Sequence, residues 1–205
     1  ANDLRVDKVS DEIGKPYVIV GGGDEYERII DIKSTNATFI IPLDFPDAYD
    51  VEDPFLASTL ELDAMREWNQ RPSNPKVLSD NNVPFALTTH KLKSPKELSK
   101  NLTKAIDYGL DKTKALEALT TVPAKILGME NSIGTLKNGA YANFLITSGD
   151  IFDGKTTLHE NWVKGDRNIL ESMDVIDPSG EYSFTAGGNT YELSISGSPS
   201  KPKAS

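Results

Sequence analysis

The 205 residues include 31 acidic and 22 basic side chains, and the resulting formal net charge of −9 argues against a nucleic-acid binder, which needs clustered Lys and Arg. With no cysteine, the chain can form no disulfide, zinc–cysteine site, iron–sulfur cluster or thiol nucleophile. No run of apolar residues approaches the ~18 that a membrane helix needs.

The first part of the chain predicts short strands that alternate with helices. A polar segment, residues 1–15, precedes the first strand, and we interpret the chain as a piece cut from a longer polypeptide. Short apolar runs bounded by Pro or Gly predict buried strands at 17–20, 38–41 and 83–89. Helices are expected at 24–33, 60–69 and 75–82, with an irregular acidic stretch at 43–59. This βα order is typical of a parallel sheet with helical crossovers.

Two helix starts stand out after the third strand. Ser94 is the expected N-cap of the first, with Pro95 at its first helical position and Glu97 closing a capping box. Asp111 is expected to cap the second, and one further turn is predicted at 123–127.

From residue 133 onward, Gly and Asn turns separate short segments of β character. Strands are expected at 143–147, 157–164, 182–186 and 191–196. The last two flank a Gly-Gly-Asn turn and predict a hairpin. Residues 197–205 are rich in Ser, Pro and Lys, which predicts a linker or tail. We therefore divide the chain into 1–130 (α/β), 131–170 (β-sandwich strands) and 171–205 (hairpin and tail).

Two motifs invite a ligand and do not fit one well. Gly21, Gly22 and Gly23 follow the first strand, but carboxylates come next where a phosphate loop needs Gly-Lys-Ser/Thr, so a tight turn beside a cavity is the better interpretation. The acidic stretch that starts at Asp44 lacks the spacing and the Gly of an EF-hand, which favours a solvated acidic loop over a calcium site.

The two histidines differ in their surroundings. His90 follows Thr88 and Thr89 just past the third strand, at the end where parallel α/β sheets bind ligands, so it is the candidate acid, base or metal ligand. His159 lies in a predicted strand beside Glu160 and is expected to be structural or exposed.

Two blocks at a fixed distance carry a family resemblance. They are A-L-E-A-L-T-T-V-P-A-K-I-L-G at 115–128 and I-G-T-L-K-N-G-A-Y-A-N-F-L-I at 133–146, preceded by V-P-F-A-L-T-T-H at 83–90 and A-I-D-Y-G-L at 105–110. They resemble the C-terminal region of the metal-dependent amidohydrolase superfamily, most closely its imidazolonepropionase-like branch. Segments 20–23 and 144–152 are similar to its large exported members from Bacteroidetes. This similarity favours an exported or periplasmic protein.

The resemblance implies the C-terminal part of a (β/α)8 barrel, of about three parallel strands with helices, followed by a small β-sandwich. It also implies hydrolysis of a non-peptide C–N bond by water activated on zinc or another divalent metal. The family's catalytic Asp aligns with His90, and Gly22, Gly23, Asp44, Thr88 and Thr89 are the expected substrate-lining residues. The H-x-H metal pair of the first barrel strands is not in this chain.

Two interpretations follow. The chain is an inactive fragment of an amidohydrolase-like parent, or it is a degenerate, noncatalytic barrel or interaction module of a larger protein. Neither needs a metal bound by this chain, and we expect no stoichiometric zinc. Three parallel strands cannot close a barrel, so we expect either association with the missing N-terminal part or a second copy, or a sheet with helices on both faces. We expect no nucleic acid or membrane partner.

Overall fold

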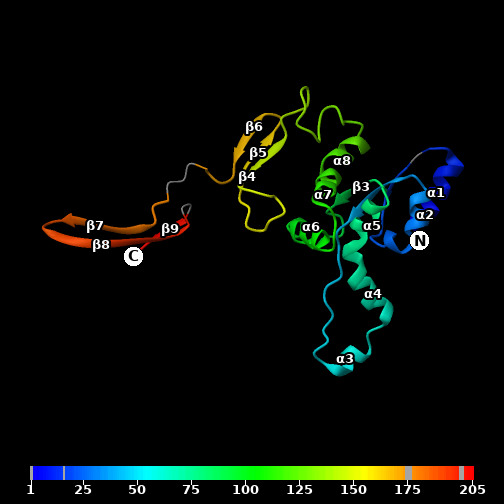
Figure 1. Cartoon of the computed structure of the whole chain (residues 1–205), viewed down its shortest axis with the longest axis horizontal. Helices are drawn as coiled ribbons and strands as arrows, with labels where there is room; N and C mark the ends of the chain where they lie inside the picture. Colours follow the sequence, from blue (N-terminus) through cyan, green and yellow to red (C-terminus); the bar gives the residue numbers. More distant parts are fainter. Residues whose placement is uncertain (1, 16, 174–176, 199–200) are drawn as a thin grey trace. The chain divides into compact units, whose positions relative to one another are not determined.

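The computed structural model describes residues 2–15, 17–173, 177–198 and 201–205. It divides into two compact units, residues 1–141 and 142–205, and each is described by itself. The first unit holds three parallel strands and the helices; the second holds antiparallel strands (Figure 1). No described helix is long and apolar enough to cross a membrane.

The first unit is built on a parallel sheet of order β1-β2-β3. Its elements, in chain order, are α1 (Asn2–Ile13), β1 (Val18–Val20), η1 (Glu25–Arg28), α2 (Ile29–Ser34), β2 (Thr38–Pro42), α3 (Pro54–Ser58), α4 (Leu62–Gln70), η2 (Arg71–Ser73), α5 (Asn74–Asp80), β3 (Phe85–Thr88), α6 (Glu97–Asp107), α7 (Lys112–Leu119) and α8 (Thr121–Ile126). Helices α7 and α8 contact β3 (Figure 1). The α/β class and the partial-barrel order predicted from the sequence are confirmed.

One face of this sheet is fully covered and the other is not. Register pairs Ile19 with Phe39 and Phe39 with Phe85, which puts these three side chains on one face, and all are at most 5% exposed. The opposite face carries Val18 and Val20, which stay 42% and 59% exposed. The strand predicted as buried at 17–20 is therefore half exposed on this face, and of the two expected alternatives, a sheet with both faces covered does not hold for β1 within this chain.

Two local predictions need correction in the first unit, and a third is confirmed. The irregular acidic stretch contains a short helix, α3, whose N-cap Asp53 accepts the Phe55 amide at 2.8 Å. The helix expected from Ser94 begins at Glu97 instead, and the Glu97 carboxylate accepts the amide of Lys93 at 3.2 Å. Asp111 does cap α7, accepting the amide of Lys114 at 3.1 Å.

The second unit consists of two three-stranded antiparallel sheets. The first contains β4 (Phe144–Thr147), β5 (Leu158–Val163) and β6 (Asp166–Ile169); the second contains β7 (Gly180–Ala186), β8 (Asn189–Ser198) and β9 (Lys201–Ala204). The predicted hairpin is β7–β8, paired from Gly180–Ile195 to Ala186–Asn189. The prediction of a linker or tail at 197–205 is wrong where the structure describes it, because β9 pairs with β8; residues 199 and 200 lie outside the described residues.

Candidate functional site

The carboxyl ends of the three parallel strands meet at one edge of the first unit. Gly21–Gly23 follow β1, Leu43 and Asp44 follow β2, and Thr89 and His90 follow β3. The amide of Gly21 donates to the carbonyl oxygen of Ile40 at 3.0 Å, so the glycine turn begins while the chain is still hydrogen-bonded to β2. This edge is where parallel α/β proteins place their ligand sites.

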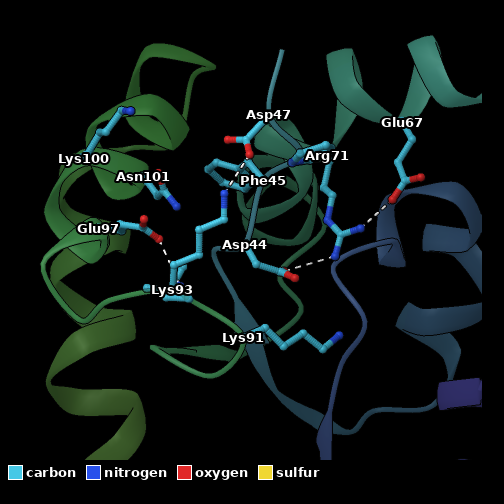
Figure 2. A pocket seen from close by; sticks show the side chains of 12 residues that line it. Asp44, Phe45, Asp47, Glu67, Arg71, Lys91, Lys93, Glu97, Lys100 and Asn101 are labelled. Carbon is cyan, nitrogen blue, oxygen red and sulfur yellow. Dashed lines mark hydrogen bonds and ion pairs between the residues drawn. The ribbon is translucent and has the colours of Figure 1, made fainter. Parts of the chain in front are cut away.

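Arg71, at the start of η2, ties these strand ends together. Its Nη2 donates to the carbonyl oxygen of Gly22 at 2.8 Å and to Asp44 Oδ1 at 3.1 Å, while Nη1 donates to Glu67 Oε1 at 2.5 Å. Figure 2 shows the guanidinium between the two carboxylates. The Arg71 side chain is only 15% exposed. A single cation thus neutralises Asp44 and fixes the glycine turn to the end of β2.

Burial and charge act on Arg71 in opposite directions. Burial of the guanidinium lowers its pKa, but the charge of Asp44 and the hydrogen bonds that Arg71 donates to Glu67 and Asp44 outweigh that effect, so the pKa of Arg71 lies above its ordinary value. Arg71 is therefore charged at neutral pH.

A cavity of about 340 Å³ opens beside this ion pair (Figure 2). Its charged lining is balanced, with four acidic and four basic side chains: Asp44, Asp47, Glu67, Glu97, Arg71, Lys91, Lys93 and Lys100. Lys93 Nζ lies 2.8 Å from Asp47 Oδ2, and Asn101 from α6 donates to Leu43 O at 2.7 Å. The volume and the mixed charge suit a small polar ligand rather than a large apolar one.

A second cavity, of about 490 Å³, lies at the end of β1. It shares Glu67, Arg71 and Lys91 with the first, and adds Gly22, His90 and Asp3 among others. Lys91 adopts a left-handed backbone, with φ of 68°. Such a conformation is uncommon for a residue other than glycine, and it lets the chain turn sharply after His90.

Three carboxylates from two elements meet next to the second cavity. Asp3 of α1 is 6% exposed and Glu25 of η1 is 2% exposed; with Asp24 they offer oxygens that all lie within 4.8 Å of one another. Asn74 Nδ2 donates to Glu25 Oε2 at 2.5 Å, and the amide of Gly23 donates to Glu25 Oε1 at 3.1 Å. A Cβ on Gly21 would lie 2.1 Å from Glu25 Oε1, so glycine at this position is what admits the carboxylate.

The Asp3 and Glu25 carboxyls have oxygens within 4.8 Å of each other, and they can hydrogen-bond to each other only while one of them holds a proton. Burial, followed by the charges of Glu25 and Asp24, raises the pKa of Asp3 to about 6. The group contains no histidine, and the oxygens of Glu25 already accept bonds from Asn74 and Gly23. This arrangement fits a shared proton rather than a cation.

The structure distributes the predicted site residues over the two cavities. Gly22 and His90 line the second, and Asp44 lines the first. Three further predicted residues, Gly23, Thr88 and Thr89, line neither. His90 is exposed, and its amide donates to Thr88 Oγ1 at 3.1 Å. Whether any of these residues binds substrate stays a prediction.

Several residues that shape the site were not predicted from the sequence. Arg71 bonds to Gly22 and Asp44 across 49 and 27 residues of chain, and Asn74 bonds to Glu25 across 49. No local pattern reveals such pairs. For Glu25 the sequence offered one weak indication: the three glycines just before Asp24 and Glu25 have no side chains and so leave space for a carboxylate.

Comparison with known proteins connects this geometry to one family. A family model described as "Amidohydrolase family" matches residues 45–181, about two thirds of the chain. A comparison with curated protein sequences finds no match.

Solved structures agree on the fold. An amidohydrolase from Thermotoga maritima MSB8 superimposes with a TM-score of 0.61 at 23% identity, over 80% of this chain and 39% of that one. A second amidohydrolase gives a TM-score of 0.57 at 18% identity, over 82% of this chain and 43% of its own. A prolidase in complex with N-methylphosphonate-L-proline gives a TM-score of 0.54 at 14% identity, over 82% of this chain and 43% of its own. The chain therefore spans about two fifths of the length of these proteins.

Proposed function

Since this chain belongs to the amidohydrolase family, we propose that it forms the C-terminal section of the barrel of a metal-dependent hydrolase from the imidazolonepropionase-like branch. The parent would hydrolyse a non-peptide C–N bond. The 205 residues by themselves would not. The order of elements supports the proposal: three parallel strands, the helices α6–α8, then antiparallel strands.

The divalent metal that the family implies does not fit the residues present. Three protein ligands, mostly His and carboxylates, are what a catalytic zinc needs. At the strand ends Asp44 is held by Arg71, and His90 stands alone on a loop. Within the described ranges, the carboxylates Asp3, Asp24 and Glu25 are the one group close enough to share an ion, and two of them can share a proton instead.

The observation that carries the proposal is the ion pair at the end of β2. Arg71 occupies the strand edge and donates to Asp44 Oδ1, so this oxygen is already engaged by a cation of the protein itself. His90 replaces the Asp that the resemblance predicts after the last strand. An exposed imidazole can move a proton, but it cannot repeat the role of a carboxylate that orients a metal-bound water.

What this section can contribute is binding. The 340 Å³ cavity has acidic and basic groups on both sides, with Glu97 and Lys100 of α6 on one side and Glu67 and Arg71 on the other (Figure 2). A small ligand with both charges, such as a dipeptide, matches this lining. The prolidase among the similar structures binds a proline phosphonate, which supports an Xaa-Pro dipeptide as the first compound to test.

The test is hydrolysis by the purified chain with added Zn²⁺ or Mn²⁺, using an Xaa-Pro dipeptide and a cyclic amide. We expect no rate above the protein-free control and, by elemental analysis, less than a stoichiometric amount of zinc. Metal-dependent hydrolysis that His90→Ala abolishes and His159→Ala leaves intact would overturn the proposal. His159 is the matched control because it lies in the second unit, with Nδ1 3.2 Å from Glu171 O.

A second candidate is a noncatalytic barrel in the parent as well. The same Arg71–Asp44 pair is compatible with it, because Asp44 Oδ1 already binds a cation of the protein itself. The parent's sequence decides between the two: an H-x-H pair after its first barrel strand supports the hydrolase, and its absence supports the noncatalytic module.

We also propose that the open side of β1 is covered by the rest of the parent chain or by a second copy. Val18 and Val20 on β1 are about half exposed, and so are Val6, Val9 and Ile13 of α1. Exposed apolar clusters of this kind usually mark an interface. Sedimentation at low concentration tests it: we expect self-association of the isolated chain, weakened by Val20→Lys. A monomer at all concentrations that also fails to bind the upstream part of the parent would refute it.

A further inference from the structure

Helix α1 packs on the first unit with its polar side inward. Along one side of the helix, Asp3 is buried and Asp7 and Ser10 are partly buried, a spacing of four and three residues. Of the apolar residues of α1, Leu4 is partly buried, whereas Val6, Val9 and Ile13 on the adjoining side are 41%, 49% and 54% exposed. Hydrophobic burial therefore contributes little to holding α1 against the strands in this chain.

The first turn of α1 supplies the attachment instead. Asp3 is the buried acidic side chain of the helix, and its carboxyl can hydrogen-bond to that of Glu25 while one of the two is protonated. Glu25 is itself fixed by Asn74 of α5 and by the amide of Gly23. The point to which α1 attaches is thus rigid, and the bond across the gap exists only while one of the two carboxyls keeps a proton.

Asp3 also forms part of the wall of the 490 Å³ cavity, together with Gly22, Arg71 and His90. We propose that α1 is a proton-dependent cover of this strand-end cavity: it docks while the buried Asp3 carboxyl beside Glu25 and Asp24 is protonated, and it is released when Asp3 ionises. Release sends that proton to bulk water and leaves the carboxylates of Asp3, Glu25 and Asp24 to repel one another. The cavity then opens on the side of the glycine turn.

The charges around Asp3 agree with this direction. Burial, followed by the charges of Glu25 and Asp24 on the turn after β1, raises its pKa. On α1 itself, burial and Asp11 raise the pKa of Asp7. Across the cavity lie Arg71, Glu67, His90 and Lys91. Helix α2, which also packs against α1, contributes Asp31, paired with Arg28, and an exposed Lys33.

The sign of the pH dependence follows from the raised value. The Asp3 pKa is about 6 when α1 is docked and 3.8 when the carboxyl is free. Docking is therefore strongest below the free value and weakens as the pH rises through 6. The two values limit the change in the docking equilibrium constant to about 100-fold between pH 3.5 and pH 8.

The absence of cysteine makes the test direct. In a Val9→Cys variant the single thiol, on the exposed side of α1, takes a rigidly attached dye, and time-resolved anisotropy then reports the motion of the helix in dilute solution with EDTA. We expect a rigid helix at pH 4.5 and an added nanosecond motion at pH 8, with a midpoint near pH 6. Asp3→Asn, whose amide can donate to Glu25 without a proton, should keep the helix docked at both pH values.

Asp11→Asn is the matched control, because Asp11 is an exposed carboxylate on the same helix outside the Asp3–Glu25 pair. It should release α1 with pH as the parent protein does. A helix that stays rigid at pH 8 in the parent protein overturns the proposal, and so does release of Asp3→Asn at the same pH as the parent. Asn at position 3 replaces a side chain of the same shape, so loss of folding does not obscure the result.

Discussion

The two units differ in how their strands bury apolar side chains. In β2, Phe39 and Ile41 are fully buried, whereas Tyr182, Phe184 and Tyr191 of the β7–β8 hairpin stay about half exposed. Each strand of the first unit is followed by a helix that returns to cover the sheet. The hairpin pairs with its neighbours locally, and its aromatic residues gather on one face without such a cover. The continuously apolar β2 is therefore covered by its own chain, whereas the equally apolar β1 is open on one face and the alternating hairpin strands have no cover.

Truncating one aromatic residue in each unit should separate these cases most clearly. We expect Phe39→Ala to cost about 3–5 kcal/mol of unfolding free energy, because Phe39 is fully buried at the centre of the sheet. Phe184→Ala should lower the unfolding free energy by about 1 kcal/mol, mainly because it removes the stacking of the Phe184 ring on that of Tyr191, whose centroids lie 5.5 Å apart.

Urea unfolding measures the two costs separately, since each unit contains one tryptophan, Trp68 or Trp162. With Trp162→Phe as background the signal reports the first unit, and with Trp68→Phe it reports the second. Equal costs for the two alanine variants would contradict the difference in burial.

Two glycines sharpen the comparison by separating steric conflict from backbone strain. Gly21→Ala places a Cβ 2.1 Å from Glu25 Oε1, so we expect roughly 2–3 kcal/mol as Glu25 loses its bonds to Gly23 and Asn74. Gly188 in the hairpin turn has a φ of 82° with open space around it, so Gly188→Ala should cost only about 1 kcal/mol of strain. The same two tryptophan backgrounds measure both, and a Gly21→Ala cost no larger than that of Gly188→Ala would show that Glu25 moves freely.

The features that could be predicted from the sequence are those that depend on residues close together along the chain. The three parallel strands, the Asp111 cap and the β7–β8 hairpin follow from local apolar runs and turn residues, and the structure contains all of them. Helix α1 was not predicted, because residues 1–15 are mostly polar and charged, and β9 was missed because a Lys- and Pro-rich segment does not suggest a strand. The arginine at the strand ends was missed for a different reason: nothing near Arg71 in the sequence indicates Asp44 or Gly22 as its partners.

The smallest expected change in stability comes from lowering the pH. It destabilises the second unit and strengthens the docking of α1 in the first. Glu160 of β5 is 2% exposed; Trp162 Nε1 donates to its Oε2 at 2.6 Å, and Arg167 of β6 binds its other oxygen. The hydrogen bond from Arg167, followed by that from Trp162, holds the pKa of Glu160 below its ordinary 4.5. A lowered pKa stabilises the folded state above the ordinary value, and that contribution is lost as the pH falls through the lowered one.

Acidification should therefore loosen β4–β6 below about pH 4.5, whereas it tightens α1 in the first unit from pH 6 downward. In the Trp68→Phe background, Trp162 fluorescence during urea unfolding at pH 7, 4.5 and 3 follows the second unit alone. Glu160→Gln keeps an acceptor for Trp162 and has no charge to lose, so its stability should change less between pH 7 and pH 3 than that of the parent. Glu192→Gln, an exposed carboxylate on β8, is the matched control and should retain the full acid sensitivity. If Glu160→Gln and the parent lose the same stability on acidification, the acid response comes from elsewhere in the unit and the role assigned to the Arg167–Glu160 pair is wrong.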